Sequence, residues 1–486
     1  MWMNFSTITK CCWMPGLLFS LVGFAQQPAN AVDISLNNLD AFKDPGINWV
    51  ISGDPLVDLQ KAHDMRPVSG EGVVVNNLTK NNQTHLYTKE EFGDLFLELD
   101  FMMAKNSNSG IFLQGRYELQ LLDSWTRTVP TFADCGGIYA RWNATRGTYE
   151  GTPPGMNVSR APGLWQHLTI KFLAPKFNSK GEKIADARFE EVYLNGVLVQ
   201  QQAAVTGPTG APINPAFNEE KPTGPLVLQG DHGLVAFKNI RYKKSWNPDE
   251  PPKGDQYWVP GSPYWNTVDP MVVTPLVKPS FIKTFLMCGD KKLTHVLSVG
   301  DPRQINYSYD LKQGNIFQIW RGAFLDLAMS WRDRGGMQLA QPLGSVIPLS
   351  DAPVLAILPD EKAPWPDSIS FDEMNNKGYT LDKQRSPTFQ YSSSGLEVKD
   401  SIVVQNNGES LSRTLTVNNA PQNLYCRIAA GKDIKTEAPG LFSVNGKSYY
   451  VSIDSKYKPI IRHGSNGDEI LVKYVGVQPV TYSIIW

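Results

Sequence analysis

Cysteine is scarce in this chain, with only five residues among 486. Two of them, Cys11 and Cys12, are in the N-terminal segment, and Cys135, Cys288 and Cys426 are widely separated. Three scattered cysteines provide neither a disulfide framework nor a structural zinc site. The sequence therefore excludes a small disulfide-stabilised fold and indicates domains that depend on hydrophobic cores.

Long apolar runs are missing except near the N-terminus. Residues 13–25 (WMPGLLFSLVGFA) follow Lys10, precede an Ala-x-Ala pattern at residues 29–31, and are too short to span a bilayer. This arrangement is typical of an export signal. We therefore expect residues 1–31 to be a signal peptide and the mature protein to be periplasmic or secreted, without a transmembrane segment.

Neither sign of charge dominates, because 46 basic residues balance 47 acidic ones. The chain therefore lacks the basic excess that favours nucleic acid or an anionic membrane as a partner. Histidine is also scarce, with six residues in all. By contrast, 40 Gly, 35 Pro and 13 Trp indicate many turns and short strands.

Short alternating segments fill the first half of the chain, and no ten-residue amphipathic helix interrupts them. Residues 92–102, 168–172 and 191–194 alternate as antiparallel strands do, and Asn195-Gly196 is a strong signal for a two-residue hairpin turn. We therefore predict an all-β sandwich over residues 32–245.

The rest of the chain divides into a connector and a second domain. Residues 246–279 contain eight prolines and three tryptophans. Proline density predicts an extended connector, and its tryptophans predict that it lies against the domains it joins. Residues 280–486 again have β character, with alternation in residues 411–417 and an Asn445-Gly446 turn signal. We predict a β-sandwich-like accessory domain there.

The most informative stretch is residues 108–123 (NSGIFLQGRYELQLLD). Alternate residues of a strand share a face, so Arg116, Glu118 and Gln120 are expected side by side, opposite apolar neighbours that point into the core. They can form a polar binding floor. A solvated strand face is the alternative, because apolar-in and polar-out alternation is common in antiparallel sheets.

Asp123 follows Glu118 by five positions, which strict alternation places on the opposite face. One β-bulge would bring it back to the same face. Laminarinase-like retaining glycosidases use this spacing for two carboxylates, which they hold roughly 5–5.5 Å apart. Here Gln120 replaces the usual central Asp, so the pattern is only partly matched. Ordinary retaining hydrolysis remains an alternative.

His232 lies in a glycine-flanked turn within residues 224–240 (GPLVLQGDHGLVAFKNI). A His with a pKa near 6.5 can act as a base, an acid or a metal ligand. The alternative is a turn His that bonds to the backbone. No comparable polar neighbours in sequence accompany the other histidines, which are His63, His85, His167, His295 and His463.

Several motifs occur in a characteristic order: NSGIF, the R-x-E-x-Q-x-x-D strand, residues 135–139 (CGGIY), residues 163–167 (GLWQH), LNGV and GPLVLQGDHGLVAFKNI. In this order and spacing the chain resembles the 3-keto-disaccharide hydrolase domain family. The resemblance implies a concanavalin-like jelly roll that acts on glycosides already oxidised at C3, downstream of a sugar 3-dehydrogenase. Some members resemble hydrolases and others lyases.

The resemblance also implies which residues form the site. Residues implied to be catalytic are His232, Glu118 and Asp123, and those implied to bind substrate are Arg116, Gln120, Tyr139 and Gln229. Two motifs depart from the family pattern: the late strand has Ala-Phe-Lys-Asn at residues 236–239 where Glu-Phe-Arg-Asn is usual, and Trp165-Gln166 replaces a Trp-Asn pair. These departures bear on substrate details.

This chemistry needs few groups. A ketone at C3 acidifies the C2 proton, so a base can remove it and the C1 substituent can leave by elimination; water addition then gives net hydrolysis. His232 with Glu118 or Asp123 could transfer the protons, and Arg116 could stabilise the enolate. A divalent metal on His232 and the acids is an alternative, although no ligand motif settles it. A carbohydrate-binding protein without catalysis is the competing function.

Overall fold

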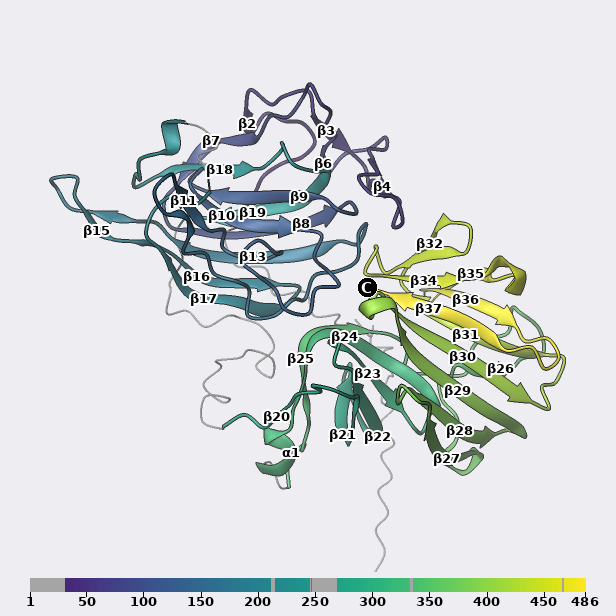
Figure 1. Cartoon of the computed structure of the whole chain (residues 1–486). Helices are drawn as coiled ribbons and strands as arrows, with labels where there is room; N and C mark the ends of the chain where they lie inside the picture. Colours follow the sequence, from purple (N-terminus) through teal and green to yellow (C-terminus); the bar gives the residue numbers. More distant parts are fainter. Residues whose placement is uncertain (1–30, 211–214, 245, 247–268, 333–334, 466) are drawn as a thin grey trace, which may run out of the picture.

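The computed structural model describes residues 31–210, 215–244, 246, 269–332, 335–465 and 467–486 (Figure 1). The regular structure is almost entirely β, which confirms the all-β prediction; the short helices among these residues are α1 (Ala328–Arg332), η1 (Pro215–Phe217), η2 (Phe371–Glu373), η3 (Asn406–Gly408) and η4 (Ser455–Tyr457). No helix in this described part is long and apolar enough to cross a membrane. The expected signal peptide, apart from Ala31, and most of the expected connector lie outside the described residues.

Residues 32–243 form a sandwich of two antiparallel sheets (Figure 1). The larger has eight strands, in the order β17 (Val197–Val205), β16 (Ala187–Leu194), β13 (Gln166–Leu173), β8 (Leu95–Met103), β19 (Val235–Lys243), β6 (Val73–Asn76) and β3 (Trp49–Ser52), with β1 (Val32–Asp33) paired to β19. The smaller has the order β10 (Tyr117–Leu122), β9 (Asn108–Leu113), β18 (Gly224–Leu228), β7 (Leu86–Phe92) and β2 (Phe42–Lys43).

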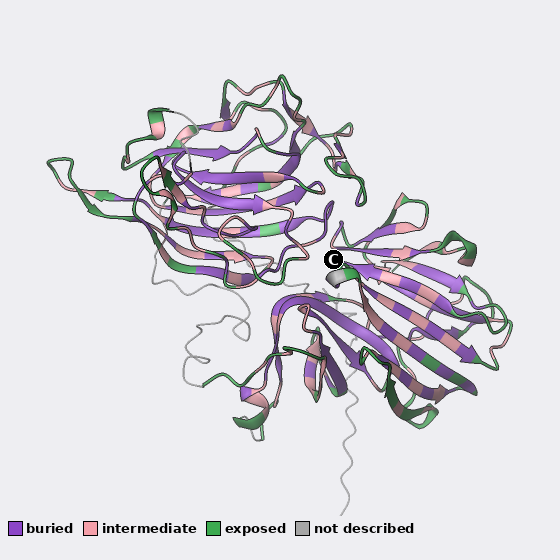
Figure 2. Ribbon diagram, viewed as in Figure 1, coloured by how far each residue is buried: buried purple, intermediate pink, exposed green. Residues whose placement is uncertain are grey.

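The sandwich follows from the period-two pattern of its strands. Leu97, Leu99 and Phe101 of β8 share one core with Ile111 and Leu113 of β9, and the inner faces of both sheets are buried (Figure 2). The Asn195-Gly196 pair joins β16 to β17 with φ values of 51° and 81°, as the hairpin prediction required. Three small pairs complete this region: β4 (Leu56–Val57) with β5 (Met65–Arg66), β11 (Arg141–Asn143) with β12 (Gly147–Tyr149), and β14 (Lys176–Phe177) with β15 (Lys183–Ala185).

Residues 272–485 form a second set of three sheets, which we call the second domain. One has six strands, β20 (Val272–Val273), β24 (Asn315–Asp326), β23 (Ile305–Asp310), β22 (Lys291–Gly300) and β21 (Ser280–Cys288), with β25 (Gln341–Pro348) paired to β24. Another has four, β26 (Leu355–Ile357), β31 (Leu424–Gly431), β36 (Gly467–Lys473) and β35 (Ile460–Gly464). The third has eight, β27 (Met374–Leu381), β28 (Pro387–Ser393), β29 (Leu396–Gln405), β30 (Ser410–Asn418), β37 (Val480–Ile485), β34 (Tyr449–Ile453), β33 (Leu441–Val444) and β32 (Ile434–Ala438).

The second domain packs directly on the first. Lys447, which is 3% exposed, donates to the Pro55 carbonyl and pairs with Asp54 at 3.1 Å. Apolar residues of the first sandwich, including Leu164, belong to the main core of the second domain. Gln304 also donates from Nε2 to the Thr128 carbonyl at 2.9 Å. Hydrophobic packing and a buried cation therefore hold the two domains together.

Candidate functional site

Strand β10 presents two of the expected site residues from one face. Every second residue from Tyr117 belongs to the core, so Glu118 and Gln120 project from the opposite face. The six residues of β10 pair with β9 without a register shift. The alternation predicted from the sequence is therefore confirmed for this strand.

The same face continues across the smaller sheet. Gln120 pairs with Gly110 on β9. Gln229 donates its backbone N–H to the Gly110 carbonyl at 2.9 Å, and Leu228 pairs with Leu86, so Gln229 and His85 lie level with Gly110. Residues on or beside the four strands β10, β9, β18 and β7 thus form one polar floor.

Glu118 is the most perturbed acid of this floor. Its side chain is only 4% exposed. Burial, with a smaller contribution from the negative charge of Asp231, raises the pKa of Glu118 to about 8. The carboxyl is therefore protonated at neutral pH and can donate a proton.

Gly110 makes room for the Glu118 carboxyl. A Cβ atom on Gly110 would lie 2.4 Å from Oε1 of Glu118, far inside van der Waals contact. On the other side, Thr209 accepts the Glu118 backbone N–H at 2.9 Å, and Gly210 lies close to Oε2. The carboxyl is thus enclosed between the glycine of β9 and the loop at residues 209–210.

His232 pairs with the neighbouring acid Asp231. The ring Nδ1 of His232 is 2.5 Å from Oδ1 of Asp231, and this hydrogen bond is the main reason that the pKa of His232 is raised. An ionised carboxylate can only accept a hydrogen bond, so Nδ1 of His232 carries a proton and donates a hydrogen bond to Asp231. In the neutral ring the lone pair of Nε2 therefore stays free. More than half of the His232 side chain is exposed, which leaves Nε2 accessible as a base.

His85 lies on the other side of Asp231. The Gly230 backbone N–H donates to Nδ1 of His85 at 3.1 Å, so the neutral ring carries its proton on Nε2. Burial lowers the pKa of His85 and keeps it neutral, although Asp231 is 3.9 Å away. The two histidines therefore have opposite tautomers: His232 offers a base and His85 a donor.

Three of the residues expected to bind substrate, Gln120, Tyr139 and Gln229, lie on or beside the strands of this floor. Gln120 donates from Nε2 to Oδ1 of Asn108 at 2.7 Å. Tyr139 donates its backbone N–H to the Glu118 carbonyl at 3.0 Å. Gln229 has a buried Oε1 without a hydrogen-bond partner among the described residues, so it can accept from a bound hydroxyl.

Arg116 does not offer its guanidinium to this floor as the sequence suggested. Its Nε donates to the Glu219 carbonyl at 2.6 Å, and its Nη1 donates to the carbonyls of Gln114 and Thr223. The guanidinium also lies over the Phe217 ring, 5.4 Å from its centre. The donors to Glu219 and Thr223 hold the loop at residues 217–223, so Arg116 positions this loop.

Asp123 is the expected residue that the structure separates from the others. Because β10 has no bulge, Asp123 keeps the alternation that places it opposite Glu118, and five residues of strand put about 16 Å between their Cα atoms. Its Oδ2 accepts the Asn106 N–H at 2.8 Å. The two carboxyls therefore cannot form a retaining pair, which requires roughly 5–5.5 Å.

Two members of this group were missed in the sequence. Asp231 stood beside His232 in the motif, and its adjacency was the available signal. No sequence neighbour distinguishes His85, because it meets Asp231 only through the fold. No group of three His, Cys, Asp or Glu in the described ranges is arranged to hold a metal ion.

The comparisons with known proteins bear on this region. Residues 37–243 match the model of the 3-keto-α-glucoside-1,2-lyase-like domain family. The resemblance stated from the motifs is confirmed over this range, and it indicates a carbohydrate-cleaving type of domain. The match does not extend into the second domain. A search among curated proteins finds no match.

Three solved structures from Parabacteroides distasonis ATCC 8503, all provisionally named as glycosyl hydrolases, are also similar. The first is 23% identical, with 45% of this chain and 85% of that chain covered and a TM-score of 0.32. The second is 21% identical (40% and 99% covered, TM-score 0.26), and the third is 17% identical (41% and 89% covered, TM-score 0.26). Scores this low add nothing to the fold or function.

Gly110 provides a test of the enclosed carboxyl. Gly110→Ala is expected to displace Glu118 and lower kcat at least about tenfold, because a 1 Å misplacement of a reacting group can cost about 100-fold. Steady-state kinetics and a melting curve measure the effect. The control is Gly93→Ala, where the new Cβ would meet only the Pro222 carbonyl, at 3.4 Å. Equal activity of both variants would show that the position of Glu118 is unimportant.

Proposed function

We propose that the first sandwich cleaves glycosides whose sugar already carries a ketone at C3, and that the protein acts in the periplasm or outside the cell. The observation that carries this proposal is the neutral Glu118 carboxyl beside the Asp231–His232 pair. A protonated carboxyl and a histidine with a free Nε2 lone pair therefore lie close to the same aspartate, Asp231. The family match over residues 37–243 and the N-terminal apolar segment support the proposal.

His232 and Glu118 each carry out one of the two proton transfers. Nε2 of His232 removes the C2 proton, which the neighbouring ketone has made acidic, and the electron pair moves toward the C3 oxygen. The C1–O bond then breaks as a C1=C2 bond forms, and Glu118 donates its proton to the departing oxygen. Water can add to C1 of the enone by the reverse transfers, giving net hydrolysis. Without that step the enzyme is a lyase.

The remaining polar groups bind and orient the sugar. His85, neutral and protonated on Nε2, is a donor suited to the C3 oxygen as charge develops there. Gln229 offers its unpaired Oε1 to a sugar hydroxyl. The proposed elimination does not require a second carboxylate at the separation of a retaining pair. The position of Asp123 away from Glu118 is therefore compatible with this mechanism.

The test is to incubate the protein in D₂O with a 3-keto-disaccharide and, separately, with its unoxidised parent. Only the keto sugar is expected to be cleaved, and NMR should show deuterium at C2 in recovered substrate or hydrated product. An enone product would identify a lyase, and a free 3-keto sugar a hydrolase. Activity measured after chelation, and again after adding a divalent ion, tests the metal alternative.

Two outcomes would contradict the proposal. Cleavage of the unoxidised parent without exchange at C2 would indicate an ordinary glycoside hydrolase. Saturable binding of both sugars with turnover of neither would indicate a carbohydrate-binding protein without catalysis.

A further inference from the structure

The second domain contains a cavity of about 720 Å³ that has no part in the chemistry described above. It lies between β26, the loop at residues 358–369 and the β28–β29 hairpin. Small-molecule sites commonly have volumes of about 300–1,000 Å³ and mostly apolar walls. The walls here include Leu355, Ile357, Leu358, Trp365, Leu396 and Val398.

The loop that forms one wall is firmly held. Gln313 accepts the Ile369 N–H at 2.7 Å and donates to the Ile369 carbonyl at 3.4 Å. Trp365 donates from Nε1 to the Pro353 carbonyl at 2.9 Å. The prolines at residues 359, 364 and 366 restrict the backbone further. A pre-formed wall of this kind loses little conformational entropy when a ligand binds.

Two side chains that carry hydroxyl groups, Tyr391 and Ser393, line the cavity. Tyr391 is 3% exposed and Ser393 is 6% exposed, and neither hydroxyl forms a hydrogen bond with the described residues. The Tyr391 hydroxyl lies beside Gly314, where a Cβ would be only 2.9 Å away. Burial raises the pKa of Tyr391, so its hydroxyl remains a donor. A hydroxyl that is open to the cavity and has no protein partner can form a hydrogen bond with an oxygen-bearing ligand.

The charged residues around the cavity indicate the class of ligand. Asp367 and Glu373 are the charged residues among its lining, and no Lys, Arg or His is found there in the described part. An anion would be repelled and would find no cation. We propose that this cavity binds an uncharged ring compound, aromatic or alicyclic, whose hydroxyl or carbonyl oxygen bonds to Tyr391.

Two probes that share a ring system and differ in charge test the proposal on the full chain. N-phenyl-1-naphthylamine is neutral, and 8-anilino-1-naphthalenesulfonate carries an added sulfonate. Fluorescence titration should show one saturable site for the neutral probe, with a Kd at least about tenfold lower than for the anion. Absence of saturable binding, or equal affinity for both probes, would overturn the proposal and leave the cavity to water.

Variants locate the site. Ile357 lines the cavity and is 42% exposed, so Ile357→Glu should fold and weaken the neutral probe at least about tenfold. Ile184→Glu, at a 66% exposed position in the first sandwich, is the matched control. In Tyr391→Phe, 2-naphthol should displace the neutral probe about two- to tenfold less effectively than in the wild type, because one hydrogen bond is lost. Displacement by naphthalene, which has no hydroxyl, should be unchanged. Unchanged binding in Ile357→Glu, or equal effects on both competitors in Tyr391→Phe, would refute the assignment.

Discussion

Replacing Glu118 by Gln is expected to lower kcat on a 3-keto-glycoside at least about 100-fold, because Gln keeps the shape but has no proton to transfer. The wild-type rate should fall above about pH 8, where Glu118 loses its proton. It should also fall at acidic pH, where His232, whose pKa is raised, becomes protonated and can no longer accept the C2 proton. A pH profile of kcat/KM measures both limbs, because kcat/KM reports the ionisations of the free enzyme.

The variants should change this profile in different ways. Glu118→Gln should remove the alkaline limb, and His232→Ala should lower kcat to a similar extent. Asp231→Asn should move the acidic limb to lower pH, because the hydrogen bond that raises the His232 pKa is weakened. Glu91→Gln, an exposed position on β7, is the control. If Glu118→Gln retained activity within about threefold of the wild type, Glu118 would be a structural acid and the proposed mechanism would fail.

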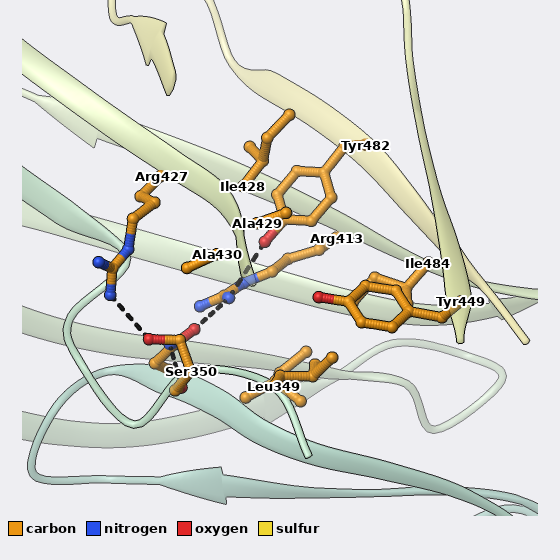
Figure 3. A pocket seen from close by; sticks show the side chains of 12 residues that line it. Leu349, Ser350, Arg413, Arg427, Ile428, Ala429, Ala430, Tyr449, Tyr482 and Ile484 are labelled. Atoms are coloured by element: carbon orange, nitrogen blue, oxygen red, sulfur yellow. Dashed lines mark hydrogen bonds between the residues drawn. The ribbon is translucent and has the colours of Figure 1, made fainter. Parts of the chain in front are cut away.

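Replacing Arg413 by Met is expected to destabilise the second domain by about 3–5 kcal/mol, because it leaves a buried carboxylate without its cation. Asp400 is 0% exposed and Arg413 is 2% exposed, and Nη2 of Arg413 is 2.6 Å from Oδ2 of Asp400. Arg413 also donates to Asn315 and Tyr482 beside a cavity of about 20 Å³ (Figure 3). Equilibrium unfolding in urea, followed by tryptophan fluorescence, measures the loss.

The control for this variant is an exposed ion pair in the same sheet. Lys377 pairs with Glu397, and both side chains are more than 40% exposed. Lys377→Met should therefore change the free energy of unfolding by less than about 1 kcal/mol. The double variant Arg413→Met with Asp400→Leu should recover part of the loss, because no buried charge remains. A loss below about 1 kcal/mol for Arg413→Met would mean that the buried pair contributes little.

Local patterns determined the β architecture and one face of the site. The alternation of residues 117–122 alone placed Glu118 and Gln120 together, because a strand has a period of two wherever it occurs. The Asn195-Gly196 turn followed in the same way from the positive φ values that this pair tolerates. Motif order indicated the resemblance of the first sandwich to a family, and the match to residues 37–243 confirms that resemblance.

Only the tertiary structure decided the chemistry of the individual side chains. Arg116 is occupied by carbonyls about a hundred positions further along the chain, and His85 reaches Asp231 from a distant strand. The raised pKa of Glu118 depends on the removal of water by segments that pack around it. Periodicity specifies the direction in which a side chain points, whereas its ionisation and its partners depend on which distant groups fill the space it points into.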